Sequence, residues 1–100
     1  MTIVKKEENG RVTFCLTGWL DALSSPELGT EVDGVETAKE LVLDFDGVEY
    51  ISSAGLRQVV AACKRAKALG ANFSVIHAGP EVMSIFKLTA LDKKMNISGK

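Results

Sequence analysis

Residues 41–56 read LVLDFDGVEYISSAGL, and this stretch decides the fold. Its beginning, residues 41–45, is a compact apolar run, the form a central strand takes when both faces of a sheet are covered. Residues 46–47 (Asp-Gly) predict a turn, and residues 50–51 a brief second extended stretch. Residues 53–69 then carry apolar side chains at helical spacing. A strand that leads directly into a helix is typical of sheets with parallel strands.

The flanking sequence adds a hairpin before this unit and more strands and helices after it. Residues 3–8 and 11–17 flank Asn9-Gly10, a strong signal for a two-residue hairpin turn. Ser24 and Glu27 have the spacing of a helical capping box. The other expected elements are a helix over 25–38, a strand over 72–77, a helix over 79–91 and a short edge strand over 95–97.

This order predicts one α/β domain over residues 1–100, because helices alternate with strands after the hairpin. We expect a mixed sheet of four to five strands, with the hairpin at its N-terminal side and a parallel centre. Three to four helices should pack against it. A chain of 100 residues fits one domain and excludes a large multi-domain catalyst such as a kinase.

Charge is balanced overall but unevenly distributed. The net charge is −1, which gives no reason to expect nucleic acid as a partner. Residues 1–50 have a balance of −7 and residues 51–100 a balance of +6. Such asymmetry indicates either charged partner surfaces or two solvated ends folded against each other.

The cysteines and the chain ends point to an ordinary cytoplasmic protein. Cys15 and Cys63 form no CxxC motif or ligand cluster, so we expect two small core residues and no metal. The N-terminal decapeptide lacks the apolar stretch of a signal peptide. No apolar run approaches the roughly 20 residues of a membrane span. We therefore expect no membrane insertion, a cytoplasmic location and a compact monomer.

Catalytic equipment is largely absent from the sequence. It contains neither a dinucleotide-binding glycine pattern, nor a phosphate-binding P-loop, nor a nucleophile elbow, so we expect no enzyme and no cofactor. The single histidine, His77, lies on a strand and is the only candidate base for a serine hydrolase. Asp44 and Asp46 share a strand face and offer a weak candidate metal site. We interpret His77 as structural and the two aspartates as solvated turn residues.

Ser52 and Ser53 are the remaining candidates. A serine at the start of a helix usually caps it, by accepting a hydrogen bond from an unpaired backbone N–H. These two also follow a central strand, so they lie outside the carboxyl end of the sheet, where sites of open α/β proteins gather. A phosphate on Ser53 would meet the positive end of the helix. Modification there could change the surface without unfolding the domain.

Residues 43–56 (LDFDGVEYISSAGL) closely resemble the signature of STAS domains, the family of bacterial anti-sigma factor antagonists and of the cytoplasmic domains of sulfate transporters. Residues 16–21 (LTGWLD) are similar to the LxGxLD segment of that family. Residues 67–73 (KALGANF) and 82–89 (VMSIFKLT) also match, so the resemblance covers nearly the whole chain.

The resemblance implies an anti-sigma factor antagonist that is switched by phosphorylation. In such proteins a serine is phosphorylated by an anti-sigma factor that is also a serine kinase, and a PPM-type serine phosphatase removes the phosphate. The unphosphorylated form binds the kinase and frees the sigma factor. The resemblance also leaves an alternative, a STAS regulatory subunit of a lipid or anion ABC transporter.

Transferred by position, the phosphoacceptor is Ser53, with Ser52 as a second candidate. Ser52 stands where the family has an acidic residue, which removes one local charge and supplies another hydroxyl. Arg57 stands where many antagonists have a small residue, and it is either a phosphate or partner contact or a solvated side chain. The resemblance places the partner-binding surface on a short set of residues: Asp21, Ser52, Ser53, Ala54, Gly55, Leu56 and Arg57.

Overall fold

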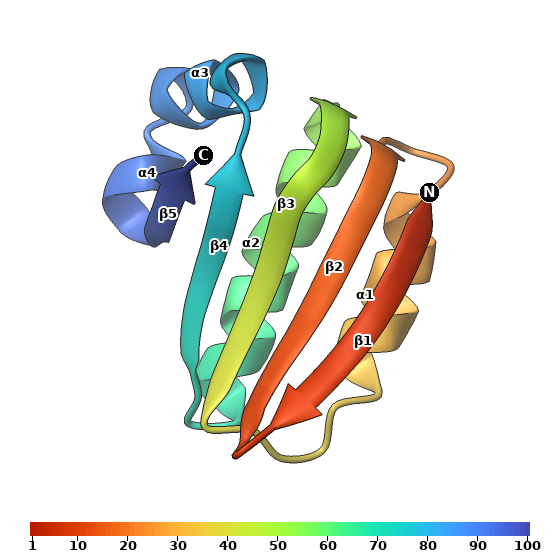
Figure 1. Ribbon diagram of the computed structural model, residues 1–100. Helices are drawn as coiled ribbons and strands as arrows, with labels where there is room; N and C mark the ends of the chain where they lie inside the picture. The colour runs from red at the N-terminus through yellow and green to blue at the C-terminus, as the bar shows by residue number, and fades with distance from the viewer.

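The computed structural model describes residues 1–100, which form one five-stranded sheet and four helices (Figure 1). The order of the strands in the sheet is their order in the chain. The elements in sequence are β1 (Thr2–Glu8), β2 (Arg11–Leu20), α1 (Ser25–Asp33), β3 (Glu40–Ile51), α2 (Ser53–Ala68), β4 (Asn72–Ala78), α3 (Pro80–Leu88), α4 (Leu91–Lys94) and β5 (Asn96–Gly99).

The sheet is mixed, as the sequence predicts. β1 and β2 pair antiparallel through the hairpin at Asn9 and Gly10, whose φ angles of 52° and 83° suit a two-residue hairpin turn. The other three pairs, β2–β3, β3–β4 and β4–β5, are parallel. In Figure 1, α1 and α2 lie behind the sheet, and no helix covers the face turned to the viewer. The parallel centre and the C-terminal edge strand are therefore both confirmed.

The core lies between the sheet and the helices α1, α2 and α3. Alternate residues of β2 and β3 point into it, as expected for strands with one covered face. They pack against the apolar sides of these three helices in one cluster. Its largest fully buried members include Phe14, Leu28, Leu43, Phe45 and Val59. Cys63 is buried and Cys15 half-buried, and both are free thiols.

The central strand is longer than the sequence predicts. β3 continues through Asp46 and Gly47 instead of turning there. Cys15 pairs with Asp44 but Thr17 pairs with Gly47, so β3 holds one extra residue at this point. The turn signal thus produces a β-bulge, which bends the strand while pairing with β2 goes on. A second extra residue follows between Val48 and Tyr50, and β2 likewise extends to Leu20 rather than ending near residue 17.

Two helices differ from their predicted bounds. α1 ends at Asp33 rather than near residue 38, and Gly34 caps it. Ser24 is not the predicted capping-box residue, because its side chain makes no cap hydrogen bond and its Oγ donates to the carbonyl of Trp19 at 2.7 Å. The predicted helix over 79–91 is interrupted at Ala90, whose φ of 60° breaks the helical path and separates α3 from α4.

None of the four helices combines the length and apolar composition needed to span a lipid bilayer.

Candidate functional site

Ser52 caps the helix α2. Its backbone is extended, with φ −97° and ψ 177°, and its Oγ accepts a hydrogen bond from the backbone N–H of Gly55 at 3.3 Å. Serine is one of the residue types that satisfy an unpaired N–H at a helix start in this way. The hydroxyl of Ser52 therefore has a structural role.

Ser53 is the first residue of α2 and is exposed. Its hydroxyl takes part in none of the side-chain hydrogen bonds of the chain. It lies at the N-terminal end of a 16-residue helix, where the aligned peptide dipoles create a positive potential. Ser53 thus presents a free hydroxyl at a position that favours added negative charge.

Gly55 allows α2 to begin directly against the end of β2. A side chain at this buried position would overlap the carbonyl oxygen of Leu20, and its Cβ would lie 2.7 Å from Cγ1 of Ile51. The backbone N–H of Ser52 donates to the same Leu20 carbonyl at 3.0 Å. These contacts join the start of α2 to the segment that leads into Asp21.

Asp21 organises the loop between β2 and α1. Its Oδ1 accepts hydrogen bonds from the backbone N–H groups of Leu23 at 3.0 Å and Ser24 at 3.1 Å, and from the Ser24 hydroxyl at 3.2 Å. The backbone hydrogen bond from Ser24 is the main cause that lowers the pKa of Asp21 below the ordinary aspartate value of 3.8. Asp21 therefore carries a fixed negative charge at the same end of the sheet as Ser53.

The other candidate residues follow along α2. Ala54 is half-buried, and Leu56 packs partly against the core. Arg57 is exposed and makes no ion pair or hydrogen bond within the chain. It lies four residues after Ser53, so the two side chains share one side of the helix. The structure thus brings Ser52, Ser53 and the Asp21 loop together through the Leu20 backbone.

Two exposed aromatic residues lie at this end of the sheet, and the sequence did not predict them as part of the site. Trp19 and Tyr50 are paired neighbours on β2 and β3, with ring centroids 5.5 Å apart and an angle of 56° between the ring planes. They remain 57% and 46% exposed, which is unusual for large aromatic side chains. Trp19 follows the in–out alternation of β2, so it points away from the core side of Leu16 and Leu20.

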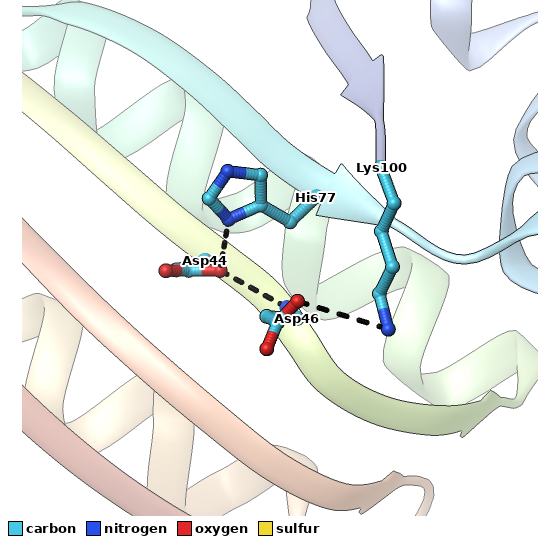
Figure 2. Close-up of polar contacts among 4 residues, drawn as sticks. All are labelled: Asp44, Asp46, His77 and Lys100. Carbon is cyan, nitrogen blue, oxygen red and sulfur yellow. Dashed lines mark hydrogen bonds and ion pairs between the residues drawn. The ribbon is translucent and has the colours of Figure 1, made fainter.

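The second candidate cluster, Asp44, Asp46 and His77, lies on β3 and β4 (Figure 2). Asp44 Oδ1 lies 3.0 Å from His77 Nδ1 and also accepts the backbone N–H of Asp46 at 3.0 Å. Lys100 Nζ lies 3.8 Å from Asp46 Oδ1, so the cluster also contacts the C-terminus.

This cluster fits a structural role. His77 adopts a φ of 60°, a strained conformation for a residue with a side chain, and its contact with Asp44 helps to hold it there. The contacts join β3, β4 and the end of the chain beside β5. No three histidine, cysteine or acidic side chains come together as metal ligands, and His77 makes no hydrogen bond to Ser53.

Comparison with known proteins identifies the family. The sequence model of the STAS domain family matches residues 2–100 of this chain. This chain belongs to the STAS domain family. Its five-stranded mixed sheet with four helices is the fold of that family.

Three relatives show what this STAS domain is similar to. A protein of Bordetella bronchiseptica named as an anti-sigma factor antagonist, BtrV, is 28% identical over 93 residues, which cover 89% of this chain and 78% of the relative. The crystal structure of an anti-sigma factor antagonist from Mycobacterium paratuberculosis has a TM-score of 0.88 at 25% identity, covering 99% of this chain and 86% of that one. The Bacillus cell fate determinant SpoIIAA, solved in its phosphorylated form, has a TM-score of 0.75 at 14% identity, covering 99% and 93%.

Proposed function

We propose that this STAS domain is a cytoplasmic anti-sigma factor antagonist, a binding module that is switched by phosphorylation of Ser53. Its unphosphorylated form binds an anti-sigma factor that is also a serine kinase, and the sigma factor is released. Membership of the family and relatives named as anti-sigma factor antagonists support this proposal. The observation that carries it is the free, exposed hydroxyl of Ser53 at the start of α2.

Ser53 is a better phosphoacceptor than Ser52 for a physical reason. Ser52 is half-buried and its Oγ accepts the N–H of Gly55, so a phosphate there would disturb the cap. The Oγ of Ser53 attacks the γ-phosphorus of ATP, the bond to ADP breaks, and the hydroxyl proton leaves to a base of the kinase. A PPM-type phosphatase hydrolyses the ester and restores the hydroxyl.

The phosphate acts on the surface rather than on the fold. It adds about −1.5 to −2 charges at a helix N-terminus, which tolerates them well. The proposed docking surface comprises the Asp21 loop, the turn at Ser52 and Ser53, and the residues from Ala54 to Arg57. Negative charge at its centre opposes contact with a partner that fits the neutral serine.

The direct test is phosphorylation in vitro. The protein is incubated with ATP and each serine kinase anti-sigma factor encoded in its genome of origin, and the phosphate is located by peptide mass spectrometry. We expect one phosphate on Ser53 and none on the Ser53→Ala variant. Phosphate on Ser52 alone would move the acceptor by one residue, and phosphate on neither serine would contradict the switch.

Variants of Ser53 test the consequence for binding. Ser53→Ala should bind the kinase constitutively, because it cannot be phosphorylated, whereas Ser53→Asp should lose about tenfold or more in affinity through the added charge. Isothermal titration calorimetry with the purified kinase measures both. Equal affinities for Ser53→Asp and the unaltered protein would disprove the switch. Binding to a transporter ATPase subunit, unaffected by either variant, would instead favour the transporter alternative.

A further inference from the structure

A groove runs beside α2, on the side of the short helix α4. Its volume is about 410 Å³, and its apolar lining comes from Leu56 and Val60 of α2 and Leu91 of α4. The three side chains are half-buried, so the fold leaves apolar surface accessible there. Arg57 and Lys64 border the groove along α2.

The border of this groove is basic. Arg57 and Lys64 are exposed, and neither makes an ion pair or hydrogen bond within the chain. Only two acidic residues occur after residue 50, namely Glu81 and Asp92. Both the apolar lining and the unpaired cations therefore call for an occupant that is apolar on one side and negatively charged on the other.

The spacing of the cations indicates the size of the occupant. Arg57 and Lys64 lie seven residues apart, or about 10 Å along the axis of α2. Two carboxylates two turns apart on a neighbouring helix have the same separation, and an amphipathic helix in an apolar groove is a common mode of recognition.

We propose that this groove binds an acidic amphipathic helix of the anti-sigma factor kinase. The apolar side chains of that helix fill the groove over Leu56, Val60 and Leu91, and its carboxylates pair with Arg57 and Lys64. This inference rests on the proposed function, because the partner is the same kinase. It extends the proposed docking surface from Leu56 and Arg57 along α2 to Val60 and Lys64, and across the groove to Leu91 of α4.

Arg57 links the groove to the switch. A phosphate on Ser53 lies four residues before Arg57 on the same side of α2, within reach of an ion pair. A phosphate that pairs with Arg57 takes this cation away from the carboxylate of the partner. Phosphorylation then weakens both parts of the docking surface at once.

Charge reversal in the groove tests the proposal. The Ser53→Ala background keeps the protein unphosphorylated, and its affinity for the kinase that modifies Ser53 is measured by calorimetry. We expect Arg57→Glu combined with Lys64→Glu to weaken binding at least about tenfold, through repulsion of the acidic helix. The matched control, Lys6→Glu, lies in β1 and should keep its affinity. Circular dichroism checks that each variant is folded.

Filling the groove tests the apolar contact separately. Ala61 is exposed on α2 and lines the groove, so Ala61→Trp occupies the space without entering the core. We expect at least about tenfold weaker binding. A carbodiimide, which joins amines to carboxylates in direct contact, should link Lys64 to an acidic residue in a helix of the kinase, identified by mass spectrometry.

The outcomes separate this inference from the proposed function. If both groove variants bind normally while Ser53→Asp does not, the groove inference is wrong and the switch stands. Self-association of the chain through the groove, seen as dimers that Ala61→Trp abolishes, would also overturn it. If no kinase phosphorylates or binds the chain, both proposals fall.

Discussion

The adjacent residues Ser52 and Ser53 have different roles because Ser52 lies just before α2 and Ser53 is its first residue. Ser52 precedes the helix and turns its hydroxyl back to the N–H of Gly55, whereas Ser53 is within the helix and its hydroxyl is free. The sequence left open which of them caps the helix and which remains available. The extended backbone of Ser52 decides it, since an N-cap residue requires a non-helical conformation.

The cap can be tested by stability. Ser52→Ala should lower the free energy of unfolding by about 0.5–2 kcal/mol, because the N–H of Gly55 loses its partner. Ser52→Asp should retain most of the stability, since aspartate also caps well. Ser53→Ala is the matched control and should change stability by less than about 0.5 kcal/mol. Urea unfolding of the variants measures these differences, and equal losses at both serines would contradict the assignment.

The carboxylate of Asp21 should make stability depend on pH. Its pKa in the folded protein is below 3.8, mainly because of the backbone hydrogen bond from Ser24. A carboxyl group whose pKa is lower in the folded state than in the unfolded state stabilises the protein above about pH 4. This contribution is lost as the pH falls through the pKa of the folded state. Asp21→Asn should therefore be less stable than the unaltered protein at pH 6, with the difference narrowing below pH 4. A difference that stays constant with pH would contradict this account.

At the scale of the elements, α2 is held in place at both ends. Its start rests on the end of β2, where Gly55 leaves room for the carbonyl of Leu20. Near its other end, Arg65 donates from Nη2 to the carbonyl of Val35 at 2.7 Å and, at 3.4 Å, to that of Asp33. This contact ties α2 to the segment between α1 and β3. These two contacts add to the packing of Val59, Ala62 and Ala66 in the core, which holds the body of α2.

Removing the second contact should weaken the fold. Arg65→Met keeps much of the apolar volume but leaves the partly buried carbonyl of Val35 without its donor, at a cost of about 2 kcal/mol. Lys67→Met is the control, because Lys67 is exposed on the same helix and makes no hydrogen bond or ion pair. Urea unfolding compares the two. Similar losses for both variants would show that the Arg65 contact contributes little.

The sequence predicted the existence and order of the elements better than their ends. Alternation in β2 and helical periodicity in α2 are local side-chain patterns, so the existence and type of these two elements were predicted correctly. The ends of β3 and α3 depend on long-range pairing and packing. The Asp46-Gly47 pair forms a bulge because pairing with β2 continues beyond it, and the helix break at Ala90 has no glycine or proline to announce it.

At the scale of the whole molecule, charge is the property that the proposed switch changes. Phosphorylation would shift the net charge from −1 to roughly −3. On isoelectric focusing, the kinase-treated protein should therefore focus below the position of the unmodified protein, whose sequence pI is 5.8. Ser53→Ala should not shift, and the far-ultraviolet circular dichroism of the phosphorylated protein should remain unchanged. A large loss of helical signal would contradict a switch confined to the surface.

The sequence by itself determined the fold class, the order of the elements and the segment that carries Ser52 and Ser53, because these follow from local patterning and motifs. Only the tertiary structure decided that Ser52 caps α2, that Trp19 and Tyr50 stay exposed, and that Leu91 lies across a groove from Val60. Such features arise where separate elements meet. They depend on how β2, β3, α2 and α4 pack against one another, which no local pattern encodes.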